Sequence, residues 1–115
     1  MLRISTSIAV AAGLLLALSG GVRAAELGEK AAVKRAVAIL KGNPYGETDA
    51  EVVAALRERR LGPRADTVCG GGATRVWSFH VVVPQPAGDA SPIDGWLVID
   101  ATSGRIVCAN LPMLD

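Results

Sequence analysis

The stretch that most constrains the fold lies near the C-terminus, where residues 95–110 read GWLVIDATSGRIVCAN. Two β-prone runs flank the segment from Asp100 to Gly104, whose composition is typical of a turn. We therefore predict a β-hairpin in which Gly104 takes the left-handed position at the turn. The second strand of this hairpin also contains Cys108, one of only two cysteines in the chain.

The first 24 residues have the pattern of a secretory signal peptide. Arg3 gives a positive start, residues 8–18 (IAVAAGLLLAL) are apolar, and small residues precede a cleavage point between Ala24 and Ala25. An uncleaved anchor is the alternative, but this apolar run is well short of the roughly 20 residues that span a bilayer. We predict residues 1–24 as signal peptide, no membrane span after its removal, and a periplasmic or secreted protein.

The remaining residues, 25–115, are predicted to form a single small domain. Of the 12 Lys and Arg residues, Arg3 and Arg23 leave with the leader, so 10 basic residues face 11 acidic ones and the net charge is −1. That balance, with both signs interspersed, gives no electrostatic footprint for nucleic acid and no polybasic patch for anionic membranes.

Cys69 and Cys108 are predicted to form a structural disulfide. Two cysteines in an exported domain of this size most often pair with each other. The alternatives are a reactive pair or a metal site, but the chain has no CxxC motif and His80 is its single histidine. Closing a loop of this length should stabilise the domain by roughly 4 kcal/mol in the chain-entropy model.

Two segments predict N-terminal helices. Residues 25–41 carry apolar side chains at spacings of three and four, and Gly42-Asn43-Pro44 ends that pattern. Thr48 and Glu51 then match a capping box for a second helix. We expect this helix to run to about Leu61, with the basic cluster 57–60 as its solvated last turn; a binding patch is the alternative interpretation.

Residues 75–83 (RVWSFHVVV) give the clearest strand. The residues expected to face the core are Trp77, Phe79, Val81 and Val83, and those expected to face outward are Val76, Ser78, His80 and Val82. Residues 66–69 are predicted as a further short strand. Residues 84–94 form a Pro-rich loop that is a candidate functional loop.

No constellation in the sequence predicts catalysis or metal binding. Ser78 or Ser103 could be combined with His80 and Asp100, but no nucleophile elbow surrounds either serine. Five further carboxylates lack the spacing of an acid–base pair or a calcium loop; they are Asp49, Glu51, Glu58, Asp89 and Asp94. We expect no catalytic residue, no metal ligand and no cofactor.

The candidate partner-binding residues are Trp96, His80 and Tyr45. Tryptophan is enriched at the centres of protein interfaces, so Trp96 is the strongest of the three. On the predicted strand Leu97 and Ile99 form the better core pair, which leaves Trp96 on the other face. The alternative is a Trp96 that is covered by the loop 84–94 or by the C-terminal tail.

Residues 95–107 (GWLVIDATSGRIV) resemble the end of a PepSY domain. That family closes with a glycine-led strand, a Val-Asp-x-x-Thr-Gly turn and a strand that opens with a charged residue. Here Ser103 stands between Thr102 and Gly104, which departs from the family's register. The resemblance implies an exported, non-catalytic binding module that binds or inhibits a secreted or periplasmic protease, and it carries over no catalytic residue.

The two cysteines lie outside the usual PepSY pattern. They favour, as an alternative, another small exported family such as an immunity-type inhibitor of a periplasmic cell-wall enzyme. A structural or envelope-associated protein is a further alternative. In each case the expected fold class is α+β, with two N-terminal helices packed on one face of a three- to four-stranded antiparallel sheet. Cys69 and Cys108 should then tie together the first and last segments of that sheet, and the expected partner is a protein of the cell envelope.

Overall fold

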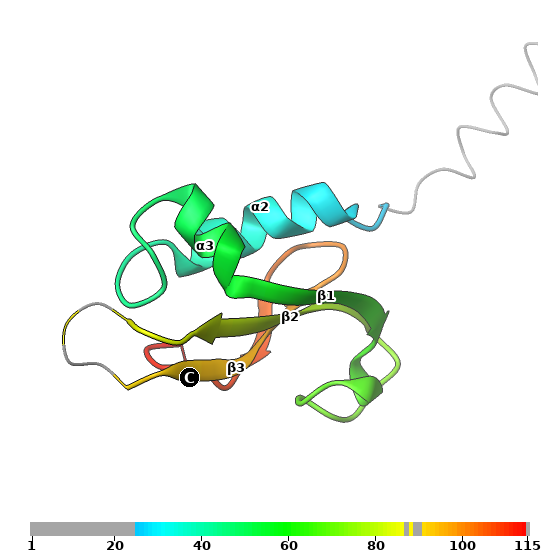
Figure 1. Cartoon of the computed structure of the whole chain (residues 1–115). Helices are drawn as coiled ribbons and strands as arrows, with labels where there is room; N and C mark the ends of the chain where they lie inside the picture. The colour runs from blue at the N-terminus through cyan, green and yellow to red at the C-terminus, as the bar shows by residue number, and fades with distance from the viewer. Residues whose placement is uncertain (1–24, 87, 89–90, 115) are drawn as a thin grey trace, which may run out of the picture.

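The computed structural model describes residues 25–86, 88 and 91–114, so the predicted signal peptide lies outside the described residues. Two helices precede four strands in the described chain (Figure 1). The elements are α2 (Glu29–Leu40), α3 (Asp49–Ala55), β1 (Leu56–Pro63), β2 (Arg75–Val83), β3 (Ile93–Asp100) and β4 (Ile106–Ala109). The α+β class, the antiparallel sheet and the disulfide are therefore confirmed. Within the described chain, no helix has the length and apolar character needed to cross a membrane.

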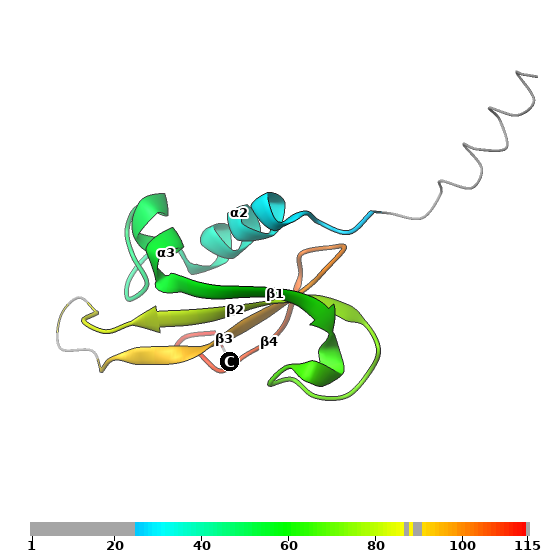
Figure 2. The same ribbon diagram turned by 45° about the vertical axis from the view of Figure 1, so that its right-hand side comes forward.

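The strands lie in the order in which they occur along the chain, β1-β2-β3-β4, and each pairs antiparallel with the next. β2 and β3 pair without a break, from Val76 opposite Asp100 to Val83 opposite Ile93. Figures 1 and 2 show α2 and α3 together on one side of this sheet. We call the opposite side, which faces away from both helices, the outer face.

The hydrophobic core lies between the helices and the sheet. Phe79, Val81 and Leu97 are fully buried there, as the alternation along the strands predicted. The helices contribute Ala32, Ala36, Val37, Leu40, Val52 and Ala55. Because truncating a buried Phe costs about 3–5 kcal/mol, the loss of Phe79 alone would remove a large share of a typical domain's stability.

The predicted capping box begins α3. Thr48 Oγ1 accepts a hydrogen bond from Glu51 N at 3.2 Å, and Glu51 Oε1 accepts one from Thr48 N at 3.0 Å. The same carboxylate accepts a further bond from Glu47 N at 2.9 Å. These backbone donors, Glu47 first and Thr48 second, lower the pKa of Glu51. Glu51 is therefore held at the start of the helix by its capping role.

The prediction that the second helix continues to Leu61 is wrong. α3 ends at Ala55, and the arginine-rich stretch forms β1 along the edge of the sheet. These residues have good helix propensity, but pairing with β2 overrides it. Leu56 becomes buried, while Arg59 Nη1 reaches Glu29 Oε2 of α2 at 3.1 Å. The basic cluster is thus a charged edge strand, which is a common protection against edge-to-edge aggregation.

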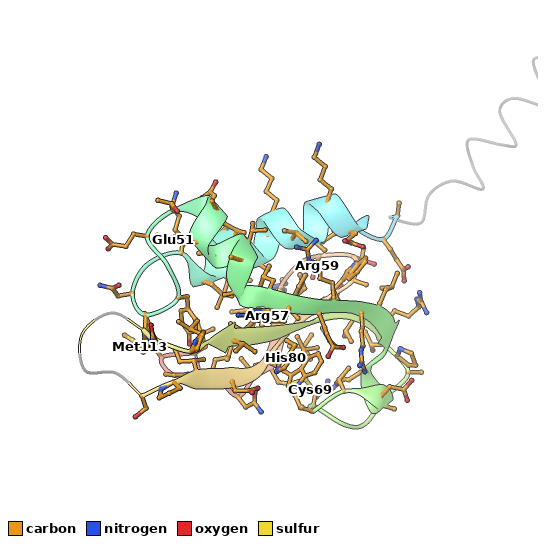
Figure 3. All side chains as sticks on the ribbon, viewed as in Figure 1. Glu51, Arg57, Arg59, Cys69, His80 and Met113 are labelled. Atoms are coloured by element: carbon orange, nitrogen blue, oxygen red, sulfur yellow. A yellow bond between two sulfur atoms is a disulfide. The ribbon has the colours of Figure 1, made fainter. Side chains whose placement is uncertain are left out.

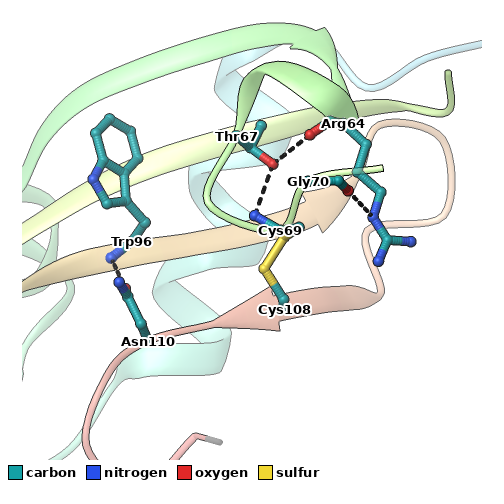
Figure 4. Close-up of a disulfide and its surroundings, with 7 residues drawn as sticks. All are labelled: Arg64, Thr67, Cys69, Gly70, Trp96, Cys108 and Asn110. Atoms are coloured by element: carbon teal, nitrogen blue, oxygen red, sulfur yellow. Dashed lines mark hydrogen bonds between the residues drawn. A yellow bond between two sulfur atoms is a disulfide. The ribbon is translucent and has the colours of Figure 1, made fainter. Parts of the chain in front are cut away.

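The predicted strand at residues 66–69 is also absent. A short 3₁₀ turn (Arg64–Asp66) and a further turn occupy this region, which we call the β1–β2 loop (residues 64–74). Thr67 Oγ1 donates to Arg64 O at 2.7 Å and accepts from Cys69 N at 3.2 Å (Figure 4). These local bonds bend the chain in place of a strand ladder. Gly70 follows with a φ of 64°, a left-handed conformation that suits glycine.

The Cys69–Cys108 disulfide joins the β1–β2 loop to the far edge of the sheet, over a sequence separation of 39 residues. Cys108 pairs with Val98 across β3 and β4, so the disulfide stands on the outer face. The loop therefore crosses β2 and β3 to reach β4 (Figure 4). Val76 and Val98 are 0% exposed and Ser78 is 4% exposed, although all three point away from the helices.

The C-terminal tail packs against the body of the domain. Leu111 is buried in the core, and the Tyr45 hydroxyl donates a hydrogen bond to Pro112 O. A Cβ at Gly95 would lie 2.6 Å from Asn110 O, closer than real contacts allow. Glycine at position 95 of β3 is therefore required by the close approach of the tail.

We expect the Cys69→Ser/Cys108→Ser double variant to lose roughly 4 kcal/mol of unfolding free energy, because the unfolded chain regains the entropy of an open loop. Urea denaturation monitored by circular dichroism measures this loss. The reduced wild type is the matched control and should unfold with the double variant. A double variant as stable as the oxidised wild type would contradict the assignment of a stabilising disulfide.

Candidate functional site

The sheet register brings His80 and Trp96 together on the outer face. His80 of β2 lies opposite Trp96 of β3 and opposite Glu58 of β1. The two rings stack with their centroids 4.9 Å apart and their planes inclined by 17°. Figure 3 shows His80 and Cys69 on the side of the sheet away from Glu51 and the helices. Two of the three predicted partner-binding residues therefore form one stack.

Charged side chains from β1 and β3 surround this stack. His80 Nε2 lies 2.6 Å from Asp94 Oδ1, and His80 Nδ1 lies 3.9 Å from Glu58 Oε1. Arg60 Nη2 lies 2.6 Å from Glu58 Oε2, and its guanidinium carbon lies 5.6 Å from the centre of the Trp96 ring. We call these five residues, Glu58, Arg60, His80, Asp94 and Trp96, the Trp96 cluster.

The contacts within the Trp96 cluster orient the His80 and Trp96 rings, but they contribute little to the stability of the fold. Exposed ion pairs contribute about 0–1 kcal/mol each, and an exposed cation–π contact about 0.5–1 kcal/mol. The backbone of Trp96 is fixed separately, because Trp96 N donates to Asn110 Oδ1 at 2.6 Å (Figure 4). Contacts on three strands and on the C-terminal segment thus hold one tryptophan in place.

A hollow of about 440 Å³ lies between the Trp96 cluster and the β1–β2 loop. Trp96 and Arg60 line it from the sheet, and Asp66 and Val68 line it from the loop. Ser78 also lines it and is only 4% exposed. The disulfide holds the loop in this position, so one wall of the hollow depends on the Cys69–Cys108 bond.

A larger hollow, of about 520 Å³, lies at the other end of β2 beside Pro84 and Pro86. Glu51 lines this hollow, but its carboxylate already accepts hydrogen bonds in the capping box of α3. The adjoining loop, predicted over residues 84–94, is only partly described by the structure. The Trp96 hollow is the better candidate site because its position coincides with the aromatic and charged cluster.

Tyr45 lies away from the Trp96 cluster. It is 5% exposed and belongs to the core, and its hydroxyl donates to Pro112 O of the tail. This placement leaves little of its surface for a partner. Its contacts instead join the turn after α2 to the C-terminal tail.

The structure does not bring together the serine, histidine and aspartate residues that were considered as a catalytic set from the sequence. Asp100 Oδ1 accepts hydrogen bonds from Thr102 N and Ser103 N, each at 2.8 Å, within its own turn. His80 pairs with Asp94 instead, and its second nitrogen faces Glu58. Among the described residues, no serine hydroxyl lies within hydrogen-bond distance of His80.

The other carboxylates are dispersed. Asp49 pairs with Lys41 at 2.9 Å, and Asp89 lies outside the described residues. In the part of the chain that the structure describes, no group of three or more His, Cys, Asp or Glu side chains could hold a metal ion. The outer face thus offers an aromatic and charged surface without a metal centre in its described part.

Comparisons of the chain with protein-family models, curated proteins and solved structures found no match. Function is therefore inferred from the Trp96 cluster and its surroundings. From the sequence, Glu58 and Arg60 were considered only within the cluster 57–60, for which a binding patch was the alternative, and Asp94 only as part of the candidate functional loop 84–94. If residues 56–63 had been predicted as a strand, the i, i+2 spacing of Glu58 and Arg60 would have placed both side chains on one face of the sheet.

Asp100→Asn should show a pH-dependent loss of stability. Hydrogen bonds from the backbone of Ser103 and then Thr102 lower the pKa of Asp100 from its usual 3.8. The resulting stabilisation is present above the unfolded-state pKa and is lost as the pH falls through the lower folded-state pKa. We expect the variant to be less stable than wild type by about 1 kcal/mol at pH 7, because charge-assisted bonds are the stronger ones.

The two proteins should converge in stability as the pH falls from about 3.8 through the lower folded-state pKa of Asp100, below which the wild-type carboxyl is also neutral. Urea denaturation of both at pH 7 and in acid measures the difference, and other titrating groups cancel because both proteins share them. A stability difference that stays constant over this range would contradict the role assigned to the ionised carboxylate.

Proposed function

We propose that this chain is an exported, non-catalytic binding module that presents its outer face to a protein partner. The observation that supports this proposal is the stack of Trp96 on His80, flanked by Arg60 and beside a hollow. Tryptophan and arginine are the residues most enriched among interface hot spots. Trp96 is only partly buried, so part of its ring surface remains available to a partner on the outer face.

The surface is pre-organised, which favours binding. Trp96 is fixed by its ring contacts and by Asn110, and the loop opposite it is fixed by the disulfide. Side chains that are already ordered lose little conformational entropy when a partner docks, so more of the contact energy becomes affinity.

Export is supported by two independent features. Disulfides such as Cys69–Cys108 persist in oxidising compartments. Residues 1–24 have the pattern of a signal peptide. We place the mature protein, residues 25–115, in the periplasm or outside the cell, and its partner among the proteins found there. The net charge of −1 after loss of the leader argues against nucleic acid as the partner.

A secreted or periplasmic protease is the partner class that we propose, on the basis of the PepSY-like residues 95–107. These residues form β3, its turn and the start of β4, and so carry Trp96 to the outer face. An immunity-type inhibitor of a cell-wall enzyme is the second candidate, favoured by the two disulfide-bonded cysteines, which lie outside the usual PepSY pattern. Both functions would use the same face, so the identity of the captured partner separates them.

A non-catalytic role agrees with the surroundings of His80. Both of its ring nitrogens face carboxylates, at 2.6 Å for Asp94 and 3.9 Å for Glu58. An imidazole in this position has no described serine hydroxyl to activate, whereas a general base must lie within hydrogen-bond reach of the proton it removes. The stack is better suited to supporting Trp96 than to acid–base chemistry.

Replacing Trp96 should abolish partner capture. Immobilised mature protein would be incubated with an envelope extract in three forms: wild type, Trp96→Ala and Met113→Ala. Met113 is a matched control because it is apolar, 80% exposed and distant from His80 (Figure 3). We expect wild type and Met113→Ala to retain one stoichiometric partner, and Trp96→Ala to bind it at least about 30-fold more weakly, as truncating a hot spot does.

Thermal denaturation of all three proteins would show that the Trp96→Ala variant is folded. Equal retention of the partner by Trp96→Ala and wild type would overturn the proposed surface. Elution of nothing beyond background proteins from wild type would count against the binding function itself.

A further inference from the structure

The hollow beside Trp96 is lined by Ser78, a serine that is largely buried. Ser78 is 4% exposed and lines the hollow, yet its hydroxyl makes no hydrogen bond with any residue that the structure describes. Among the described residues no side-chain nitrogen or oxygen is both buried and unpartnered, so the Ser78 hydroxyl remains accessible at the wall of the hollow. A hydroxyl oxygen in this position is free to accept a bond from a group that enters the hollow.

The unpaired charge on the wall of the hollow is negative. Arg60 and Asp66 are the charged residues that line it, while Glu58 and Asp94 lie beside the adjoining His80–Trp96 stack. Arg60 is already neutralised by Glu58 at 2.6 Å, whereas Asp66 is exposed and has no ion pair among the described residues. On the opposite side of the sheet, α2 carries Lys30, Lys34 and Arg35. A partner group that is complementary to this hollow is therefore cationic.

The contact between Arg60 and Trp96 shows that the Trp96 ring can pack against a cationic group. The Arg60 guanidinium carbon lies 5.6 Å from the ring centre, within the range of a cation–π contact. The walls of the hollow also include Val68, which is 53% exposed, and Pro63. Apolar walls of this kind can pack against the methylene stem of a long cationic side chain.

We infer that this hollow binds a lysine or arginine side chain projecting from the protein partner. The methylene stem packs between Trp96 and the β1–β2 loop, and the charged head pairs with Asp66 and donates a hydrogen bond to Ser78. This inference rests on the proposed function, since it specifies the chemistry of the partner that docks on the same face. Arg60 and Glu58 form the rim of the hollow.

The test uses small peptides and the two indole signals in a ¹⁵N–¹H NMR spectrum of the mature protein. Blocked tripeptides Gly-Lys-Gly and Gly-Arg-Gly are titrated at low salt, with Gly-Glu-Gly and Gly-Leu-Gly as comparisons. The basic peptides should shift the Trp96 indole and the Thr67 and Val68 amides in a saturable way. The Trp77 indole, which donates to Leu27 O at 2.9 Å on the other side of the sheet, should not move.

Two variants locate the charged head. Asp66→Asn and Ser78→Ala should each raise the Kd of the lysine peptide about fivefold, the effect of losing one exposed ion pair or one hydrogen bond. Glu47→Gln removes an exposed carboxylate from the loop before α3 and is the matched control, which should bind as wild type does. The two indole signals of each variant show that it is folded.

The inference is overturned if the lysine and arginine peptides cause no saturable shift. It is also overturned if the leucine peptide binds equally well, or if Asp66→Asn leaves the Kd unchanged. If any of these results is found while Trp96→Ala still loses the partner, the outer face binds a protein through other chemistry. If Trp96→Ala retains the partner as well, the proposed function fails together with the inference.

Discussion

The disulfide between Cys69 and Cys108 is the constraint on which the outer face depends. It holds a glycine-rich loop across β2 and β3, from one edge of the sheet to the other. That position covers Val76, Ser78 and Val98, which would otherwise face solvent. The sheet therefore packs against the helices on one side and against a short covalently held loop on the other. The end of the outer face that the loop leaves uncovered carries Trp96.

Much of the fold could be predicted because its signals are local. Thr48 and Glu51 formed the expected capping box, Phe79 and Leu97 alternated into the core, and the turn after Asp100 closed as a hairpin. The end of α3 could not be predicted in this way. Whether residues 56–63 form a helix or a strand is decided by their pairing with β2, which is a tertiary interaction. The region 66–69 depended equally on a turn built by the Thr67 side chain.

The candidate site could be predicted only in part, because tertiary contacts bring its residues together. Trp96 and His80 were candidates from residue type and strand face, but their stacking follows from the β2–β3 register. Arg60 was assigned to the end of a helix, so its position over Trp96 was beyond sequence reasoning. Tyr45 carried no local sign that the C-terminal tail would cover it. Contacts across the sheet assemble this site, and these contacts can be identified only when the register of the strands is known.

Hydrogen exchange of the oxidised and the reduced protein tests most directly whether the disulfide builds the outer face. Reduction should remove protection from the β1–β2 loop and lower it at Ser78 and Val98 by more than at the amides of α2 and of the core residue Phe79, whose protection falls only with the global unfolding free energy. Reduction should also shift the Trp96 indole signal, because one wall of its hollow is released. Unchanged exchange in the loop, or an equal loss of protection throughout the protein, would contradict the account.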